Sequence, residues 1–269
     1  MIDRRKVRDA FGRQAHEYDA HAAVQKRVIG RFMKILEAEG RAPRRLLDVG
    51  AGTGMLLGSL RHLYGDAFAV GIDLALGMNQ AARQNLQTDG RCQVMTADAE
   101  RLPFAAESFD LVLSTSTFQW LTTLDAAFGE AFRVLAPGGL FFFSLFGGQT
   151  LHELRSSYRR ALVAAGCPED NRSHTFFSEN DVTAALERAG LKNCRTLSEQ
   201  DIDLHADVPF LLRTLKRIGA GSASPHTLRG LAGKRVMLEM MDGYRREYGK
   251  QSGIPATYEI IYGMGEKAC

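Results

Sequence analysis

The sequence lacks several features that would place it in a class at once. Across 269 residues the formal net charge is only +3, and no long run of lysines or arginines occurs. Such a balance gives no reason to expect a nucleic-acid partner. No stretch approaches the roughly 18 apolar residues of a membrane span, and the N-terminus lacks the apolar core of a secretory signal. We therefore expect a cytoplasmic protein without a membrane span.

Cysteine and histidine are sparse, and neither shows the spacing of a metal site. The four cysteines form no CxxC pair, which is typical of reduced thiols in a cytosolic protein. His16, His21 and His152 have no paired ligand spacing, so no metal is predicted. No Ser-His-Asp or Cys-His arrangement is evident either. We interpret the chain as a monomer that works without a metal or a protein nucleophile.

Strand and helix patterns alternate through the first half of the chain and predict an α/β fold with a parallel sheet. The predicted strands are 44–50, 68–73, 91–98, 109–116 and 138–146. The predicted helices between them are 53–64, 76–86 and 126–135. Helix-like sequence also fills residues 4–38, with breaks expected near Gly12 and before His21.

After Gly147 this rhythm changes, and a late insertion followed by a closing strand suggests a cap on the sheet. The insertion is predicted to contain helices 151–165, 179–189, 208–218 and 227–248 and an extended segment, 193–204. We expect a single domain, 1–269. Its predicted parts are an N-terminal helical lid (1–40), a core (44–146), a cap (147–255) and a closing strand (256–266).

The strongest short motif is LLDVGAGTG at residues 46–54, where a strand ending at Asp48 leads through a glycine-rich turn into a helix. Gly50, Gly52 and Gly54 supply tight backbone geometry and let a ligand approach the main chain. Ligands of open α/β sheets bind outside the carboxyl ends of the strands, where this turn lies. The dinucleotide pattern GxGxxG is disfavoured, because the position for its last glycine holds Met55.

Two acids at the ends of the next strands strengthen this prediction. Asp73 ends the second strand, where a carboxylate can accept hydrogen bonds from both hydroxyls of a ribose. Asp98 ends the third strand and precedes Ala99, a position from which it can read an adenine amino group. Alone, Asp73 is equally a helix N-cap and Asp98 a loop acid. Together, on successive strand ends, they favour a nucleoside site.

The segments LLDVGAGTG, GIDLALGM, TADAERLPF, FDLVLST and RVLAPGGLFF, within residues 44–146, resemble the Rossmann-like S-adenosylmethionine-dependent methyltransferases. The resemblance implies a mostly parallel seven-stranded sheet flanked by helices, with a helical insertion after strand five. It implies S-adenosylmethionine as cofactor and S-adenosylhomocysteine as product. It places Asp48 and the glycines along the methionine portion, Asp73 on the ribose, Leu74 and Met78 beside the adenine, Asp98 and Ala99 at its edge, and Ser114 beneath the sulfonium.

Four further segments narrow the resemblance: FGRQAHEYDAHAAVQ (11–25), STFQWL (116–121), GGQTLHELRSSY (147–158) and LLRTLKRIGA (211–220). In this order they resemble the malonyl-acyl-carrier-protein O-methyltransferases, which open the pimeloyl branch of biotin synthesis. The implied reaction methylates the free carboxylate of a malonyl thioester, which is ionised at neutral pH and needs no general base. Two alternatives stay open: a quinone-type small-molecule C- or O-methyltransferase, and a respiratory-complex assembly factor with arginine hydroxylase activity.

The reaction requires a positioned anion, and an arginine is the natural clamp. Arg155 is the first candidate, with Arg213 and Lys216 as alternatives. Tyr18, in the predicted lid, is a candidate to cover the reacting methyl and orient the acceptor. Gln119 and Trp120 follow the fourth strand and are candidates for the acceptor wall. Ordinary packing or a solvated helix position explains each of these residues equally well in isolation.

One helix of the predicted cap carries a basic face, formed by Arg213, Lys216 and Arg217. An acyl carrier protein is strongly acidic, so its enzymes need a basic patch near the acceptor site. We predict that this face binds malonyl-acyl carrier protein, with Arg155, Arg159 and Arg160 as further candidates. Without a partner, the same pattern describes a surface helix with solvated charges. The sequence leaves coenzyme A open as the alternative thioester handle.

Overall fold

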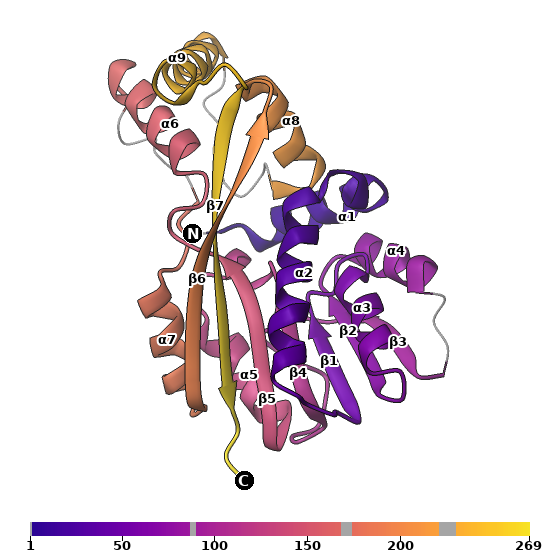
Figure 1. The fold of residues 1–269 in the computed structure, drawn as a ribbon. Coiled ribbons are helices and arrows are strands. Elements are labelled where there is room, and N and C mark those ends of the chain that lie inside the picture. Colours follow the sequence, from indigo (N-terminus) through magenta and orange to yellow (C-terminus); the bar gives the residue numbers. More distant parts are fainter. Residues whose placement is uncertain (1, 87–89, 168–173, 221–229) are drawn as a thin grey trace.

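A computed structural model describes residues 2–86, 90–167, 174–220 and 230–269 (Figure 1). Its centre is a seven-stranded sheet of order β3-β2-β1-β4-β5-β7-β6. The strands are β1 Arg45–Val49, β2 Phe68–Asp73, β3 Cys92–Thr96, β4 Phe109–Thr115, β5 Leu135–Phe146, β6 Lys192–His205 and β7 Ile254–Glu266. Strand β7 runs opposite to the other six of these strands and pairs antiparallel with β5 and β6. The predicted mostly parallel sheet is confirmed, and the extended segment 193–204 is its edge strand β6.

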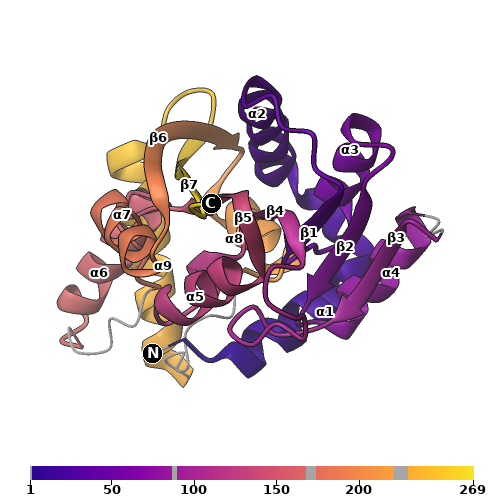
Figure 2. The same cartoon turned by 90° about the horizontal axis from the view of Figure 1, so that it is seen from below.

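Helices cover both faces of the sheet, with α2 and α3 on one side and α5 on the other (Figure 2). The α-helices are α1 Arg4–His21, α2 Ala23–Ala38, α3 Met55–Leu63, α4 Leu76–Leu86, α5 Asp125–Val134, α6 His152–Ala164, α7 Glu179–Arg188, α8 Val208–Arg217 and α9 Gly230–Tyr248. A short 3-10 helix, η1, spans Phe118–Trp120.

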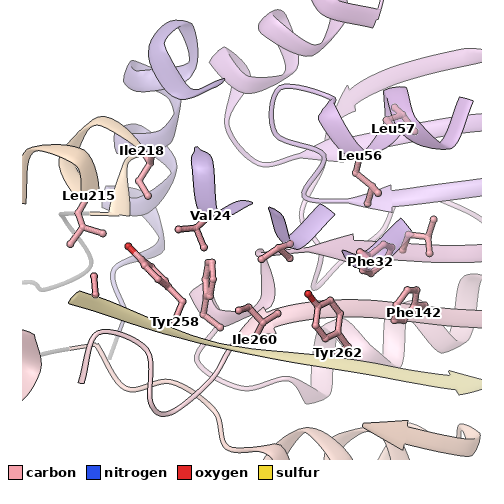
Figure 3. Close-up of a cluster of buried hydrophobic side chains, with 14 of the residues drawn as sticks. Val24, Phe32, Leu56, Leu57, Phe142, Leu215, Ile218, Tyr258, Ile260 and Tyr262 are labelled. Carbon is pink, nitrogen blue, oxygen red and sulfur yellow. The ribbon is translucent and has the colours of Figure 1, made fainter. Parts of the chain in front are cut away.

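Each face of the sheet buries an apolar core, because the central strands are covered on both sides. Phe32 of α2 stacks on Phe142 of β5 with ring centroids 3.9 Å apart, and both are fully buried (Figure 3). On the opposite face Phe128 of α5 packs against Phe141 and Phe143. Side chains from α2 therefore belong to the core, so within the predicted lid 1–40 it is α1 that covers the strand ends.

Helix α1 runs without interruption through Gly12, so the break predicted there is wrong. The glycine serves a helix crossing instead: a Cβ placed on Gly77 of α4 would lie 2.3 Å from the carbonyl oxygen of Gly12. Two glycines thus let the backbones of α1 and α4 approach closely. The second break falls at Ala22, just after His21 rather than before it.

The late helices α6, α8 and α9 gather where the long strands β6 and β7 extend past the rest of the sheet (Figure 1). They lie within the segment 147–255, for which the sequence predicts a cap. The range 147–255 also contains β6 and α7, which belong to the sheet and its covering layer. Within the described ranges, no helix combines the length and apolar character needed to cross a bilayer.

Candidate active site

The chain order creates a crevice at the carboxyl ends of the strands. From β1 the chain moves outward to β2 and β3, then returns to β4 on the other side of β1. The loops diverge at such a switch point and leave room for a ligand. A cavity of about 810 Å³, counting its solvent-open part, lies here and is named the strand-end cavity. Its lining includes the predicted residues Tyr18, Gly50, Gly52, Asp73, Leu74, Met78, Ala99 and Trp120.

The glycine turn shapes the floor of the strand-end cavity. Gly50 has φ +76°, and a Cβ there would lie 2.1 Å from Oγ1 of Thr117, so the position tolerates only glycine. Gly52 also has positive φ, but a Cβ there would meet no protein atom within 4 Å. Because Gly52 lines the cavity, that open space is where a ligand can approach the backbone.

Asp73 holds the turn in place. Its Oδ2 accepts a hydrogen bond from the Gly52 N–H at 3.1 Å, and its Oδ1 accepts one from the Ala75 N–H at 2.7 Å. Burial raises the pKa of Asp73, and these two N–H groups act against that rise. Each carboxylate oxygen keeps a second lone pair for a ligand hydroxyl.

Asp48 lies in the interior below the turn, with 1% of its surface exposed, and does not line the strand-end cavity. Burial, followed by the nearby charge of Asp73, raises its pKa to about 8. Within the described residues, its Oδ2 has no hydrogen-bond partner. Burial and mutual repulsion disfavour the ionised forms of Asp48 and Asp73. A cation bound nearby would stabilise these ionised forms, so the two carboxyl groups favour a cationic ligand.

Three other predicted ligand contacts do not line the strand-end cavity. Asp98 accepts a hydrogen bond from Nη2 of Arg4 at 2.5 Å, while its neighbour Ala99 does line the cavity. Ser114 is fully buried and donates to the main-chain oxygen of Val49 at 2.7 Å. Gly54 is the N-cap residue of α3, and a Cβ there would lie too close to Leu86 of α4. Contacts of Asp98, Ser114 and Gly54 with a ligand remain predictions.

A second cavity, named the cap cavity, lies between the strand ends and the cap, with about 1920 Å³ including its open part. It shares Phe11, Tyr18, Ser116 and Trp120 with the strand-end cavity, so the two meet. Its apolar wall contains Leu151, Leu154, Leu212, Leu215, Ile218, Met237 and Met240. Polar side chains in its lining include Gln25, Gln119, Arg155, His174 and Lys216.

Tyr18 lies at the junction of the two cavities. Burial, followed by the charges of Asp73 and Asp19, raises its pKa, so the hydroxyl stays protonated at neutral pH. Its helix is tied to the strand ends through Asp19, which accepts hydrogen bonds from Oγ1 of Thr53 at 2.6 Å and from Nδ2 of Asn85 at 3.3 Å. The lid therefore presents a neutral donor where the cavities meet.

Arg155 brings a positive charge to the cap cavity. Its Nη2 donates to the main-chain oxygen of Gly148 at 2.8 Å, and its guanidinium lies 5.5 Å from the ring centroid of Phe176. Burial and the neighbouring Arg159 lower the pKa of Arg155, whereas the charge of Glu259 acts against this fall. An anion that enters the cavity would stabilise the charged guanidinium. Gln119, 1% exposed, donates from Nε2 to the Ser116 oxygen at 2.6 Å.

The three basic residues of α8 have different surroundings. Lys216 lines the cap cavity, whereas Arg213 lies over the ring of Phe210, 5.8 Å from its centroid. Arg217 contacts Nε2 of His21 at 3.4 Å. In the part of the chain that the structure describes, no acidic side chain forms an ion pair with any of the three. Arg160 is engaged by Glu247, and Arg159 is exposed.

The structure adds three rings to the site beside the predicted Trp120: those of Phe11, His174 and Phe176. Phe11 lies edge-on to Trp120 with ring centroids 5.5 Å apart, and Trp120 lies 5.2 Å from His174. His174 in turn lies 4.3 Å from Phe176. These four rings form one aromatic wall from the lid to the cap. No short-range pattern could find it, because its members come from three distant segments.

Comparisons with known proteins identify the family of the chain. A family profile described as a methyltransferase domain matches residues 47–143. The malonyl-[acyl-carrier protein] O-methyltransferase of Geobacter sulfurreducens is 54% identical to the chain, covering 99% of the chain and 100% of that protein. The chain belongs to this methyltransferase family. The enzyme of the same name from Methylovorus sp. is 39% identical, covering 99% of the chain and 90% of that protein.

Solved structures show the same fold. One of a putative methyltransferase from Bacillus halodurans has a TM-score of 0.63 at 16% identity, covering 90% of this chain and 99% of that one. Another, of Haemonchus contortus phosphoethanolamine N-methyltransferase 2 with S-adenosyl-L-methionine, has a TM-score of 0.56 at 18% identity, covering 89% and 53%. The family assignment favours the first of the three activities that the sequence left open.

Proposed function

We propose that this chain transfers a methyl group from S-adenosylmethionine to the free carboxylate of malonyl-acyl carrier protein and forms the methyl ester. The observation that carries the proposal is the meeting of two cavities at Tyr18 and Trp120. One cavity has the features of a nucleoside site, and the other holds the cationic Arg155. The names of the related enzymes supply the identity of the acceptor.

The residues of the strand-end cavity fit S-adenosylmethionine. Gly52 leaves open space toward the cavity, and Asp73 offers lone pairs to ribose hydroxyls. Leu74, Met78 and Ala99 give apolar walls suited to an adenine ring. The buried carboxyl groups of Asp48 and Asp73 favour a cationic ligand over a neutral one of the same shape.

The chain's own residues bind, orient and exclude water rather than move protons. S-adenosylmethionine, when bound, supplies the methyl group, and the O–CH₃ bond forms as the CH₃–S bond breaks with its electron pair passing to sulfur. A malonyl carboxylate is already ionised at neutral pH, so no general base is required. The raised pKa of Tyr18 keeps its hydroxyl a hydrogen-bond donor. Alignment in a water-poor cavity is the main source of rate.

Arg155 is the proposed clamp for the carboxylate. Its main-chain partner Gly148 and the ring of Phe176 fix the guanidinium. An arginine that bound the attacking oxygen tightly would lower its nucleophilicity, so we place Arg155 on the other oxygen. Replacing Arg155 with Lys keeps the charge but removes the fork geometry. We expect this change to lower kcat/KM for malonyl thioesters about tenfold or more.

The basic face of α8 is the proposed docking site for the carrier protein. We expect Arg213→Glu, Lys216→Glu and Arg217→Glu each to raise KM for malonyl-carrier protein, and added salt to weaken the wild-type interaction. Malonyl-pantetheine has no acidic protein body, so its KM should change far less with Arg213→Glu and Arg217→Glu. The exposed Lys34 and Lys192 supply matched control reversals on other surfaces. Unchanged kinetics on the carrier-bound substrate in all three α8 variants would exclude this docking site.

We propose that this reaction is an early step of pimeloyl and biotin synthesis, as the resemblance in the sequence implies. We propose that the chain acts as a cytoplasmic monomer, in keeping with four cysteines that form no disulfide. Light scattering at working concentration tests the monomer directly, and a dimer mass would contradict it.

The activity is tested with methyl-labelled S-adenosylmethionine and three acceptors: malonyl-carrier protein, malonyl-coenzyme A and free malonate. We expect label in a base-labile methyl ester with the malonyl thioesters and none with free malonate. Preference for the carrier over coenzyme A identifies the handle. Absence of transfer to both thioesters would refute the proposed function.

A further inference from the structure

Glu259 of β7 holds the loop that follows the neighbouring strand β5. Its main-chain oxygen accepts a hydrogen bond from the Gly147 N–H at 2.9 Å. Its carboxylate reaches the same loop, where Oε2 accepts a hydrogen bond from the Gln149 N–H at 2.7 Å. The second carboxylate oxygen, Oε1, accepts one from Oγ of Ser198 on β6 at 2.9 Å. Glu259 therefore fixes the residues on both sides of Gly148.

The packing around this carboxyl group is close. A Cβ placed on Gly147 would lie 2.7 Å from Cδ of Glu259, whereas nonbonded carbon atoms normally stay about 3.5 Å or more apart. Oγ1 of Thr150 donates to the main-chain oxygen of Glu259 and accepts from the Glu259 N–H, both at 3.2 Å. The peptide groups beside Gly148 consequently have little freedom to rotate.

Glu259 and Arg155 bind opposite ends of one peptide group. The N–H that donates to Glu259 belongs to Gln149, and the carbonyl of the same peptide group belongs to Gly148, which accepts from Nη2 of Arg155 at 2.8 Å. A trans peptide group is planar, so its N–H and its C=O point in opposite directions. An N–H that is fixed by Glu259 therefore fixes the direction of the carbonyl that Arg155 binds. A carboxylate on the N–H also polarises the group and strengthens its carbonyl as an acceptor.

The charge of Glu259 suits a supporting role for Arg155. Burial and Arg159 lower the pKa of Arg155, and the charge of Glu259 opposes this fall. A carboxylate in direct contact with an anionic acceptor would repel it. Arg155 lines the cap cavity, whereas Glu259 is among the lining residues of neither the cap cavity nor the strand-end cavity. The bond to Gly148 uses one of the five N–H donors of Arg155, so donors are left for a carboxylate.

We propose that Glu259 is a positioning residue that orients Arg155 toward the acceptor carboxylate through the peptide group between Gly148 and Gln149. The inference rests on the proposed function and adds a residue to the carboxylate clamp. Glu259 acts through Arg155 and not by touching the substrate. Its replacement should therefore weaken the binding of a free carboxylate and leave the binding of an uncharged methyl ester unchanged.

Two replacements of Glu259 grade the effect. Glu259→Met removes the charge and both acceptor oxygens, whereas Glu259→Gln removes the charge and keeps one oxygen for the Gln149 N–H. We expect kcat/KM for malonyl-pantetheine to fall about tenfold in Glu259→Met and about threefold in Glu259→Gln. The matched control is Glu266→Met, which removes the contacts of another acid of β7 with Arg41 and Asn193 and should leave kcat/KM unchanged.

A double-mutant cycle with Arg155→Met separates positioning from a general loss of structure. Because Glu259 acts through Arg155, adding either Glu259 replacement to Arg155→Met should lower kcat/KM by less than about twofold further. Losses that multiply in the double variants would overturn the inference, as would an unchanged kcat/KM in either single Glu259 variant. If Glu259→Met fails to fold, the cycle with Glu259→Gln decides by the same criteria.

A second measurement does not depend on turnover. Calorimetry with the full chain saturated with S-adenosylhomocysteine compares the binding of malonyl-pantetheine and of its methyl ester. We expect Glu259→Met and Glu259→Gln to lose affinity for the free carboxylate about tenfold and threefold, with unchanged affinity for the ester and for S-adenosylhomocysteine. Equal losses for the free carboxylate and the ester would overturn the inference.

The wild type and Arg155→Met distinguish a failure of the inference from a failure of the proposed function. A wild type that methylates no malonyl thioester would refute the proposed function. Methylation by the wild type together with an unchanged kcat/KM in Arg155→Met would overturn the inference and leave the function standing.

Discussion

Asp48 makes the stability of the ligand-free protein sensitive to pH in a direction opposite to that of most carboxylates. Burial raises its pKa in the folded state to about 8, from an ordinary value of 3.8. Between about pH 4 and pH 8, Asp48 therefore keeps its proton in the folded chain and has lost it in the unfolded chain. The contribution to the free energy of unfolding is complete below about pH 4 and is lost as the pH rises through 8.

The magnitude follows from these two values. Between pH 6 and pH 8 the group withdraws about 2 kcal/mol from the free energy of unfolding. Asp48→Asn has nearly the same shape and cannot ionise, so its stability should lack this loss. From pH 6 to pH 8, we expect the free energy of unfolding of wild type to fall by about 2 kcal/mol relative to that of Asp48→Asn.

Denaturant unfolding at pH 6, 7 and 8 measures these free energies. Asp66 is fully exposed, so the control Asp66→Asn should show the same dependence of stability on pH as wild type. Parallel pH profiles for wild type and Asp48→Asn would refute the reasoning. The same unfolding measurement, repeated with S-adenosylmethionine, tests whether the ligand is sensitive to the charge of Asp48. Because a sulfonium cation favours the ionised carboxylate, S-adenosylmethionine should stabilise wild type more strongly at pH 8 than at pH 6.

Further predictions concern single side chains. Gly50→Ala should lower the melting temperature, because its Cβ would lie 2.1 Å from the Thr117 side chain and disrupt the turn. Gly52→Ala should fold but lose affinity for S-adenosylhomocysteine, which calorimetry measures, because its Cβ would occupy the open space at the cavity. Tyr18→Phe should lower kcat roughly tenfold with unchanged S-adenosylhomocysteine affinity, and an unchanged kcat would remove the hydroxyl from the account. Phe32→Ala should lower the free energy of unfolding by about 3–5 kcal/mol, measured in denaturant; a much smaller loss would contradict the stacked core.

Much of the fold could be predicted because its signals are local. Alternating strand and helix patterns gave the order of the elements, and the turn at Gly50 and Gly52 marked the strand ends. The expected break at Gly12 failed for a tertiary reason: the glycine permits the crossing with Gly77 rather than ending a helix. A glycine's role in packing becomes visible only when its neighbour in space is known.

In the site, too, positions fixed by local structure could be predicted, whereas those that depend on tertiary contacts could not. Asp73 lines the strand-end cavity, as its position at the end of β2 predicts, because a strand end fixes its location. Asp98 was predicted to end the third strand, but β3 ends at Thr96, and the Asp98 carboxylate two residues on pairs with Arg4 of α1. His174 was missed because Trp120, which its ring contacts, comes from a distant segment, and a lone histidine carries no spacing signal. Which side chains reach the site depends on contacts between the lid, the strand ends and the cap, and a local sequence pattern does not contain these contacts.

The central claim is that the malonyl carboxylate of a carrier-bound thioester receives the methyl group. Intact-mass spectrometry of malonyl-carrier protein after incubation with the enzyme and S-adenosylmethionine tests it most directly. We predict a gain equal to one CH₂ on malonyl-carrier protein, reversed by mild base, and no gain on acetyl-carrier protein, which lacks the carboxylate. No gain on the malonyl form, or an equal gain on both forms, would contradict the account.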